Sequence, residues 1–397
     1  MPLLIGLMSG TSADGVDAAL VQIDGNACAP RTHLLAFHTH PFPEGMRAAI
    51  LAASDLRTST VDLLCRLNVA LGEVFAEAAI EVARQAGLSI AAVDLIGSHG
   101  QTVRHLPEPS PFCGYSIRAT LQLGEPSVIA ERTGVMTAAD FRPRDMAAGG
   151  EGAPLTPYVH YRLFADAQRS RVIHNIGGIS NVTLLPAGAA LADVRAFDTG
   201  PGNLPIDGAV GRITGGQEGF DKDGVRARHG RVHQPLVDEL LAHPFLARQP
   251  PKSTGREAFG APFVEQVCAR SMALGIWGDD LIATLTAFTA ASIADAYRRF
   301  VLTRLPQVET VLCGGGSRNP TLMAWLRREL PEVEWRLCDD FGISADALEA
   351  VTFAVLAHAT GCGQAANVPT ATGAGQAVVL GKIVPGKDGW KGLQTFR

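Results

Sequence analysis

The sequence predicts an α/β protein built from two halves that share one order of elements. Each half begins with a glycine-rich hairpin, at residues 3–23 and 171–185. In each half a long helical pattern later precedes a strand that ends in a glycine-bearing turn. Strands that alternate with helices are typical of α/β folds. The length of 397 residues suits two domains, and each half is long enough to bury its own hydrophobic core.

The composition is that of a globular protein. Hydrophobic residues make up 47% of the chain and charged residues 18%. The net charge of -5, with no block of Lys and Arg, argues against nucleic-acid and anionic-membrane partners. No signal-peptide pattern follows Met1, and the longest apolar runs, such as residues 281–291, are too short to span a bilayer. Seven scattered cysteines without a Cys-x-x-Cys pair indicate a reducing, cytoplasmic location.

In the first half, apolar runs at residues 3–8 and 17–23 flank a polar turn, Ser9–Asp17, which contains two glycines, three hydroxyls and two aspartates. Apolar residues then recur at three- and four-residue spacing from Leu64 to Val82, which predicts a helix that ends near Gly87. We expect a buried strand over residues 93–100 to follow this helix.

In the second half, residues 171–185 read as a strand, a Gly-Gly turn and a second strand. A helical pattern over residues 281–300 and a strand over 308–316 follow. This order favours an internal duplication, although an α/β protein can also show it by chance. The segment 140–157 is dense in turn formers and reads as an ordered loop. We therefore expect two lobes that pack closely around a cleft.

Three glycine-rich turns are candidates for phosphate contact, at residues 9–15, 177–178 and 314–316. Glycine lets backbone amides approach phosphate oxygens, because a side chain would block the approach. Each turn alone is more often simple hairpin geometry, but their repeated place after strands favours nucleotide binding. The chain lacks both the Gly-x-x-x-x-Gly-Lys-Ser/Thr motif and a Gly-x-Gly-x-x-Gly motif after a strand. This argues against a P-loop ATPase and a Rossmann dehydrogenase.

Three aspartates adjoin these turns. Asp198 lies at a predicted strand end before a Thr-Gly-Pro-Gly turn, where a carboxylate can accept a proton or hold a metal-bound water. Asp14 and Asp17 could orient Mg²⁺ through water, because this ion keeps much of its hydration. For all three the alternative is a turn-capping or helix-capping role.

Two further segments carry polar side chains that suit a ligand. The segment "GSHGQTVRH" places polar groups after a buried strand, which fits a ligand crevice of an open α/β sheet, although a histidine there is more often structural. The segment "DFRPRD" places Arg142 and Arg144 between Asp140 and Asp145. Two arginines suit a carboxylate or a phosphate, and mutual ion pairs with the aspartates are the alternative.

Taken together, these motifs resemble the anhydro-N-acetylmuramic acid kinase family. The resemblance extends from the first strand to the C-terminal region, and it is carried by "GLMSGTSADGVD", "IGSHGQTVRH", "DFRPRDMAAGGEGAPLTP", "NIGGISNVTLL", "FDTGPGN", "DKDG", "KSTGRE", "CGGGSRNPTLM" and "LGKIVPG". It implies a two-lobed actin-like ATPase (ribonuclease H-like) fold, with duplicated mixed β-sheets flanked by helices. The expected lobes are residues 1–168, to which 370–397 return, and residues 169–369, with ATP in the cleft. The resemblance also implies a homodimer.

The same resemblance implies the reaction. An ATP-dependent kinase of this family converts 1,6-anhydro-N-acetylmuramic acid, an amino sugar of recycled bacterial cell wall, to N-acetylmuramic acid 6-phosphate. Water opens the anhydro ring while phosphate is transferred. Asp198 matches the catalytic base of the family, and Glu349 matches a second catalytic carboxylate that binds substrate or orients the water.

The remaining site residues that the resemblance implies fall into three groups. The residues expected to bind ATP are Gly10, Thr11, Ser12, Ala13, Asp14, Gly15, Val16, Asp17, Gly177, Gly178, Gly315, Gly316 and Asn319. Mg²⁺ is expected beside Asp14 and Asp17, through water. The sugar is expected at Ser98, His99, Gln101 and Arg142, with Arg142 facing the lactyl carboxylate.

Two alternatives remain at this point. An ordinary hexose or amino-sugar kinase of the same fold would use Asp198 to deprotonate a free hydroxyl. A chaperone-like or regulatory ATPase of the same superfamily would turn over ATP without a sugar.

Overall fold

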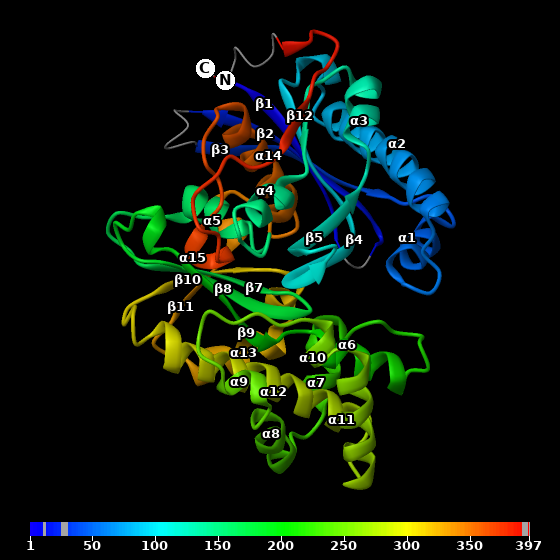
Figure 1. Cartoon of the computed structure of the whole chain (residues 1–397). Coiled ribbons are helices and arrows are strands. Elements are labelled where there is room, and N and C mark those ends of the chain that lie inside the picture. Colours follow the sequence, from blue (N-terminus) through cyan, green and yellow to red (C-terminus); the bar gives the residue numbers. More distant parts are fainter. Residues whose placement is uncertain (11–12, 25–30, 391–395, 397) are drawn as a thin grey trace. The chain divides into compact units, whose positions relative to one another are not determined.

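The computed structural model describes residues 1–10, 13–24, 31–390 and 396, and the chain forms two compact α/β units (Figure 1). Unit 1 comprises Met1–Leu163 and Gly342–Arg397, and unit 2 comprises Phe164–Phe341. The chain therefore returns to unit 1 at Gly342, whereas the sequence placed this return at residue 370. The earlier return follows from helix α14 (Leu348–Gly361), which packs on the sheet of unit 1.

Unit 1 contains a seven-stranded mixed sheet in the order β12-β6-β4-β1-β2-β3, with β5 paired to β4. β1 pairs in parallel with β4 and antiparallel with β2. The strands are β1 (Leu3–Ser9), β2 (Gly15–Asp24), β3 (Arg31–Pro41), β4 (Leu95–Phe112), β5 (Tyr115–Leu123), β6 (Thr137–Ala139) and β12 (Lys382–Val384). Besides α14, the helices are α1 (Met46–Ser54), α2 (Val61–Gln85), α3 (Pro126–Thr133), α4 (Phe141–Ala147), α5 (Thr156–Phe164) and α15 (Pro369–Thr372).

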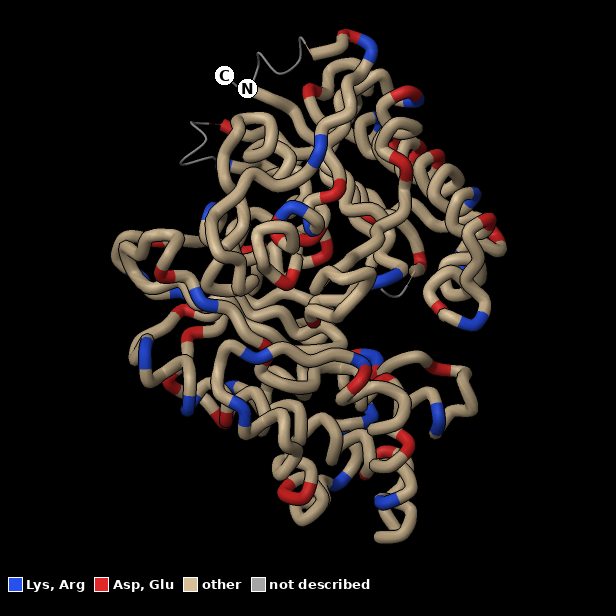
Figure 2. Tube along the Cα trace, viewed as in Figure 1, with Lys and Arg blue, Asp and Glu red and all other residues tan. Residues whose placement is uncertain are grey.

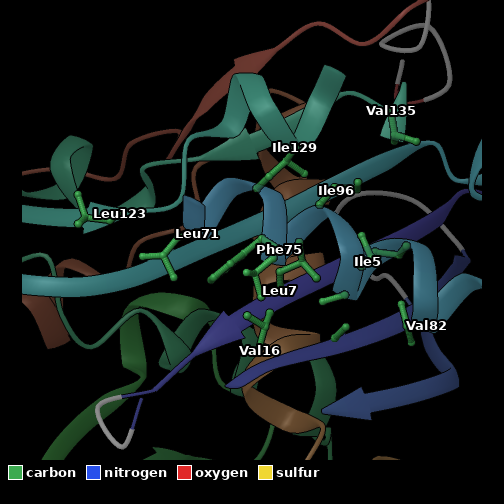
Figure 3. Close-up of a cluster of buried hydrophobic side chains, with 14 of the residues drawn as sticks. Ile5, Leu7, Val16, Leu71, Phe75, Val82, Ile96, Leu123, Ile129 and Val135 are labelled. Carbon is green, nitrogen blue, oxygen red and sulfur yellow. The ribbon is translucent and has the colours of Figure 1, made fainter. Parts of the chain in front are cut away.

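The predicted helix of the first half is α2, and it covers one face of the sheet. The Thr60 hydroxyl accepts a hydrogen bond from the Leu63 amide at its start, and Gly87 follows its end with φ +72°. The apolar stripe of α2 packs on alternate residues of the strands, such as Ile5 and Ile96 (Figure 3). This period-two pattern assigns each strand side chain to one of two faces.

The opposite face of the sheet is covered by α14. Gly6 of β1 and Gly97 of β4 lie directly against the backbone of this helix, next to Ala350 and Phe353 respectively. Side chains at these two positions would fill the space that the helix backbone occupies. Two glycines therefore allow a close helix-to-sheet contact, which brings the start of α14 beside the ends of the strands.

Unit 2 contains a five-stranded mixed sheet in the order β11-β10-β7-β8-β9. Its strands are β7 (Arg171–Ile176), β8 (Ile179–Leu185), β9 (Arg195–Pro201), β10 (Glu309–Cys313) and β11 (Glu334–Leu337). Its helices are α6 (Leu204–Ile213), α7 (Val225–His229), α8 (Gln234–Leu241), α9 (Pro244–Ala247), α10 (Arg256–Phe259), α11 (Ala261–Ala273), α12 (Asp279–Ala296) and α13 (Pro320–Glu329). α12 is buried on nearly all sides and joins two hydrophobic clusters of this unit.

The two sheets share a topology. β1-β2-β3 and β7-β8-β9 are antiparallel meanders, and β4 and β10 each pair in parallel with the first strand of their meander. In each unit a long helix, α2 or α12, precedes that parallel strand. The predicted α/β fold class, with mixed sheets flanked by helices and repeated in both halves, is confirmed.

One strand differs from its predicted length. β4 continues to Phe112 and forms a long hairpin with β5, whereas the sequence placed the strand end at residue 100. The polar residues that the sequence placed after the end of this strand lie inside it, because β5 pairs with them.

Charged residues of both signs are interspersed along both units (Figure 2). Within the described ranges, no helix combines the length and apolar character needed to cross a membrane.

The contact between α14 and the sheet gives a first prediction. In Gly6→Ala the added methyl would overlap the backbone around Ala350 and Ala354, which cannot rotate away. We expect a loss of roughly 1–3 kcal/mol of stability, as for an overpacked core, measured as a lower melting temperature in calorimetry. Gly219→Ala is the control, since its methyl would meet no heavy atom within 4 Å. Equal melting temperatures for the two variants would contradict the proposed tight contact.

Candidate functional site

The polar turn between β1 and β2 is braced from β4. The Ser9 hydroxyl lies 2.6 Å from Oε1 of Gln101 and 2.8 Å from the Gly15 carbonyl. The Gln101 side-chain amide donates to the Gly10 carbonyl at 3.2 Å. Gln101 was predicted to bind the sugar, but its side chain instead supports the turn. Thr11 and Ser12, two of the predicted ATP-binding residues, lie outside the described residues.

The geometry of this turn requires unusual backbone conformations. Ala13 has φ +53°, and its amide donates to the Gly10 carbonyl. Gly15 lies against the backbone of His40 in β3, where a side chain would collide. Val16 is fully buried in the core on the α2 face. The described residues of this segment, 9–10 and 13–17, are therefore held by contacts with β3 and β4.

The two aspartates of the turn differ in environment. Asp14 is exposed, and its carboxylate lies 3.5 Å from Arg47. Asp17 accepts a hydrogen bond from the Thr39 hydroxyl at 2.6 Å. Burial raises the pKa of Asp17, and the nearby Asp346 raises it further, against the effect of Thr39. Neither of the two aspartates caps a helix.

Asp17 belongs to a group of ionisable side chains on the α14 face of the sheet. Its neighbours Val16 and Ala18 point into the core on the α2 face, so Asp17 points to the other face. Glu349 stands in the first turn of α14. The pKa of Glu349 is raised by desolvation within the surrounding protein and by Asp17, while Arg142 lowers it. Two carboxylates that repel one another at the start of α14 are a feature of ligand sites.

Arg142 joins this group from the start of α4. Its Nε donates to Nε2 of His99 at 3.0 Å, and its Nη1 donates to the Gly152 carbonyl at 2.9 Å. Burial lowers the pKa of Arg142 to about 10, so it remains charged at neutral pH. Burial and Arg142 together hold the pKa of His99 well below its usual range. His99 is therefore neutral, with Nδ1–H donating to the Gly100 carbonyl.

The loop that follows Arg142 is organised by Asp145. This fully buried carboxylate accepts hydrogen bonds from the Gly152 amide, the Asn367 side-chain amide and the Thr372 hydroxyl at 2.8–2.9 Å. The sequence suggested Asp140 and Asp145 as partners of the arginines. Instead, Asp140 pairs with Lys382 at 2.9 Å, and Asp145 fixes the loop that accepts from Arg142.

Ser98 and His99 are consecutive residues of β4, so their side chains point to opposite faces of the strand. The His99 ring packs on Phe353 of α14. Both residues border a cavity of about 330 Å³ whose lining also includes Asn68 of α2 and Glu125. The Ser98 hydroxyl is fully buried and has no hydrogen-bond partner in the described part of the chain. The two predicted sugar-binding residues therefore border one cavity, although their side chains leave the strand on different faces.

In unit 2, Asp198 lies within β9 and is held by a loop more than fifty residues away in sequence. Its Oδ2 accepts hydrogen bonds from the Thr254 amide at 2.8 Å and the Ser253 hydroxyl at 3.2 Å. Its own amide donates to the Lys252 carbonyl at 3.0 Å. Burial raises the pKa of Asp198 to about 6, although the bonds from residues 253 and 254 lower it. No hydrogen bond to its Oδ1 is found within the described residues.

Lys252 anchors the loop from behind. Its side chain is 5% exposed, and its ammonium lies 4.8 Å from the ring centre of Phe245 and 5.1 Å from that of Phe300. Nζ donates to the Leu246 carbonyl at 3.3 Å. Burial lowers the pKa of Lys252 to about 8. Residues 252–254 were not among the candidate site residues, because their contact with Asp198 joins segments more than fifty residues apart.

The glycine turns of unit 2 lie at the carboxyl ends of β7 and β10. The carbonyls of Gly177 and Gly178 accept hydrogen bonds from the amides of Asn203 and Gly202, and Leu204 also donates to Gly178. Gly316 packs on Ile176 at the end of β7. Because β7 and β10 are parallel, these turns meet at one edge of the sheet, which is the usual ligand edge of such sheets.

Asn319 has a structural role at this edge. Its side-chain oxygen accepts from the amides of Thr321 and Leu322 at the start of α13. The Thr321 hydroxyl donates to the Gly224 carbonyl at 2.7 Å, so the segment "DKDG" lies beside this cap. Gly315 begins the short 3₁₀ turn Gly315–Arg318, which directly precedes Asn319. The described residues contain no group of three or more His, Cys, Asp or Glu arranged to hold a metal ion.

The raised pKa of Asp198 predicts a stability effect. A carboxyl group whose pKa is higher in the folded than in the unfolded chain contributes stability at low pH, which is lost as the pH rises through its folded pKa. Because the pKa rises from an ordinary 3.8 to about 6, the cost of ionising Asp198 in the folded chain at pH 8 is on the order of 3 kcal/mol. We therefore expect Asp198→Asn to raise the melting temperature at pH 8, with the gain vanishing near pH 4.

The matched control for this prediction is Asp238→Asn, an exposed aspartate of α8 that accepts a hydrogen bond only from Gln234 among the described residues. Calorimetry at pH 8 and pH 4 measures both variants against the parent chain. If Asp198→Asn were less stable than the parent chain at pH 8, this would contradict the expectation that ionised Asp198 destabilises the fold.

Comparisons with known proteins agree on one family. Residues 2–386 match the family model described as anhydro-N-acetylmuramic acid kinase. A protein of Caldanaerobacter subterraneus subsp. tengcongensis with that name is 48% identical over 381 residues, covering 96% of each chain. A protein of Bacillus thuringiensis with the same name is 44% identical over 382 residues, covering 96% of this chain and 98% of that protein.

Solved structures give weaker likenesses. Component A of the (R)-2-hydroxyglutaryl-CoA dehydratase of Acidaminococcus fermentans aligns with a TM-score of 0.43 at 13% identity, covering 89% of this chain and 98% of that chain. A ROK family glucokinase of Streptomyces griseus aligns with a TM-score of 0.37 at 13% identity, covering 89% and 97%. Scores below 0.5 establish no relationship, so the assignment depends on the sequence matches. Those matches span nearly the whole chain at 44–48% identity, and the chain belongs to the anhydro-N-acetylmuramic acid kinase family.

Proposed function

We propose that this chain is an ATP-dependent kinase that converts 1,6-anhydro-N-acetylmuramic acid to N-acetylmuramic acid 6-phosphate in cell-wall recycling. Membership of the family supports the substrate and the product. The observation that carries the chemistry is Asp198, whose Oδ2 is held by backbone and hydroxyl donors while burial raises its pKa to about 6. A cytoplasmic enzyme that forms a homodimer is part of the same proposal.

The reaction requires one base and one phosphoryl donor. Water attacks the anomeric carbon of the sugar, the bond from this carbon to the bridging oxygen breaks, and that oxygen attacks the γ-phosphorus of ATP. ADP leaves, and the proton of the attacking water passes to the base and then to solvent. Inverting glycosidases activate water in the same way, but here the phosphoryl group replaces the proton that a general acid would give to the leaving oxygen.

Asp198 suits the role of this base. With two donors on Oδ2, its Oδ1 is the oxygen that accepts the proton of the water. A pKa of about 6 leaves the carboxylate ionised at neutral pH, yet more basic than an ordinary aspartate. We assign Glu349 to a second role, in binding the sugar or orienting the water. Arg142 and Asp17 have opposite effects on its pKa, so its charge responds to ligands beside them.

Each unit carries glycine turns that are proposed to contact ATP. In unit 1 the segment Gly10–Asp17 would present backbone amides to phosphate, braced by Ser9 and Gln101. In unit 2 the turn Gly177–Gly178 would contact phosphate, and Gly315, Gly316 and Asn319 would lie beside the adenosine. The role of Asn319 in capping α13 fixes this edge. Phosphoryl transfer depends mainly on such positioning and on charge neutralisation.

Mg²⁺ fits unit 1 only as an ion held largely by phosphate and water. Asp14 is paired with Arg47, and Asp17 has a raised pKa beside Asp346. Two carboxylates without a third ligand suit this ion, which keeps much of its hydration. Bound there, Mg²⁺ would neutralise phosphate charge, and Asp17 would hold its water ligands in the ionised form.

For the sugar, Arg142 remains the proposed partner of the lactyl carboxylate, and the neutral His99 beside it orients the guanidinium. Ser98 can serve only a ligand group that enters the cavity on the α2 face. Gln101 supports the β1–β2 turn and through it the phosphate site.

The test of this function follows oxygen from water. Incubation with ATP, Mg²⁺ and the anhydro sugar in ¹⁸O-water is expected to place label on the anomeric hydroxyl of the phosphorylated product, with one ADP for each sugar opened. Phosphorylation only of ring-opened sugars would identify an ordinary sugar kinase. ADP production that does not depend on sugar would identify an ATPase of another class.

The same assay on Asp198→Asn tests the base. We expect turnover to fall by roughly 10²–10⁴-fold, the usual contribution of a positioned base, while ATP binding in calorimetry is unchanged. For the parent chain, kcat/KM should fall as the pH decreases through about 6, because protonated Asp198 cannot accept a proton. Asp238→Asn serves as the control. Retained turnover in Asp198→Asn would remove Asp198 as the base.

The role of Arg142 gives a separate prediction. Lysine cannot reproduce the planar fork of donors that arginine offers a carboxylate, so Arg142→Lys should raise KM for the anhydro sugar by roughly 10-fold or more. KM for ATP should not change. Arg144→Lys, an exposed position of the same motif, is the control. An anhydro sugar without the lactyl group should bind equally to the parent and to Arg142→Lys. If Arg142→Lys also bound this analogue more weakly than the parent chain does, Arg142 would support the fold of the site and would not bind the lactyl carboxylate.

A further inference from the structure

Behind Asp198, five buried polar side chains form a hydrogen-bonded chain across unit 2. We propose that this chain, which comprises Thr199, Ser180, His174, Tyr297 and Thr310, is a positioning network that aims the Asp198 carboxylate by holding an irregularity in β9. The inference rests on the proposed role of Asp198 as the base, and it adds residues that do not touch the substrate.

The irregularity is a β-bulge beside the base. In the pairing of β8 with β9, Ser180 faces Gly200 and Asn181 faces Asp198, so Thr199 is the extra residue. Bulges bend a strand and redirect its side chains, and they recur next to active sites. The Thr199 side chain is fully buried, and its hydroxyl lies 2.6 Å from the Ser180 hydroxyl and 3.1 Å from the Ser180 carbonyl. The extra residue is therefore tied to the neighbouring strand by its side chain.

The hydrogen-bonded network continues through β7 to the end of α12 and to β10. The Ser180 hydroxyl lies 2.8 Å from Nε2 of His174, and Nδ1 of His174 lies 3.0 Å from the Tyr297 hydroxyl. That hydroxyl lies 3.3 Å from the Thr310 hydroxyl. All five side chains are buried, with an exposed fraction of 0%. The network thus links four strands and one helix of a single unit.

The protons of this chain can be placed without leaving its central members unpaired. Burial lowers the pKa of His174 to about 3, so the ring is neutral and has one donor and one acceptor nitrogen. Thr199 donates to Ser180, Ser180 donates to Nε2, Nδ1–H donates to Tyr297, and Tyr297 donates to Thr310. Buried polar chains rigidify a core when they are satisfied and are costly when they are broken. An apolar core would fill the space equally well, but it would not fix the register of the bulge.

The end of α12 places the Tyr297 side chain in this hydrogen-bonded network. α12 passes directly into a π-helical turn, Tyr297–Val301, where the Leu302 amide bonds to the Tyr297 carbonyl. Such turns are rare and often mark functional sites. The Tyr297 ring stacks on His174 with ring centres 5.5 Å apart. Helix, turn and ring stacking all fix the far end of the network.

Asp198 is therefore fixed from two directions. The loop 252–254 holds its Oδ2 and its amide, while the network holds the next residue, Thr199, in the bulge. The loop alone leaves the path of β9 free to straighten, which would turn Asp198 away from its present direction. A base displaced by about 1 Å loses on the order of 100-fold in rate.

The test compares two substitutions of similar size. Thr199→Val keeps the shape and removes the hydroxyl, and Thr199→Ser keeps the hydroxyl. We expect Thr199→Val to lower kcat by about 10–100-fold, with KM for ATP unchanged and with a shifted acidic limb of the kcat/KM profile. Thr199→Ser should restore both. A lower melting temperature of Thr199→Val without a change in kcat or in the pH profile would overturn the proposal.

Tyr297→Phe probes the far end of the network, where one hydroxyl is removed and the ring stacking is kept. Tyr297→Phe should change kcat and the pH profile in the same direction as Thr199→Val. In the double variant Thr199→Val with Tyr297→Phe, the loss of kcat should be smaller than the product of the losses in the two single variants. Independent, multiplicative effects would show that the two residues do not act through one chain.

A readout without turnover separates this inference from the proposed function. The pKa of the Asp198 carboxyl, followed by ¹³C NMR in the parent chain, should shift in Thr199→Val and return in Thr199→Ser. If Asp198→Asn keeps full activity, the proposed function of Asp198 fails, whatever this pKa does. If the pKa is the same in all three proteins, the positioning network fails, whatever the activity does.

Discussion

The close packing of α14 on the sheet of unit 1 is the constraint on which its candidate site depends. Gly6 and Gly97 leave no side chain between the sheet and the helix backbone, so the first turn of α14 reaches the edge where the strands end. Glu349 then stands beside Asp17 and Arg142, which are far away in sequence. A helix held one side chain further from the sheet would carry Glu349 away from these groups, and Phe353 would lose its contact with His99.

In unit 2, the candidate catalytic carboxylate of Asp198 is held in place by hydrogen bonds and not by a close helix-to-sheet contact. A carboxylate that must be basic has to lose part of its hydration, and the resulting cost opposes folding. The Thr254 amide and the Ser253 hydroxyl offset a part of that cost at one oxygen. Lys252 lies behind the same loop between aromatic rings, where its charge lowers the pKa of Asp198 only weakly. The donors fix the direction of the carboxylate, and burial sets its basicity.

The sequence predicted the elements better than the contacts between them. The spacing of apolar residues located α2 and α12, and the glycine turns located the hairpins, because both signals are local. The support of Asp198 by residues 252–254 depends on a contact between distant segments, which no local pattern reports. The same holds for Asp145, which the sequence suggested as a partner of arginines and which accepts instead from Gly152, Asn367 and Thr372. The length of β4 was missed because its outer half is polar and pairs only with β5.

The two aspartates that the sequence treated alike show what tertiary structure adds. Asp14 lies in one glycine-rich turn and Asp198 shortly before another, and turn capping was an alternative for each. Asp14 is exposed and paired with an arginine, so its carboxylate keeps its hydration. Asp198 lies in a bulged strand between a bonded loop and a buried polar chain. This environment raises the basicity of Asp198 and fixes the direction of its carboxylate, and a general base requires both properties. The chemistry of this chain therefore depends less on the presence of an aspartate in a glycine-rich turn than on the core that surrounds it.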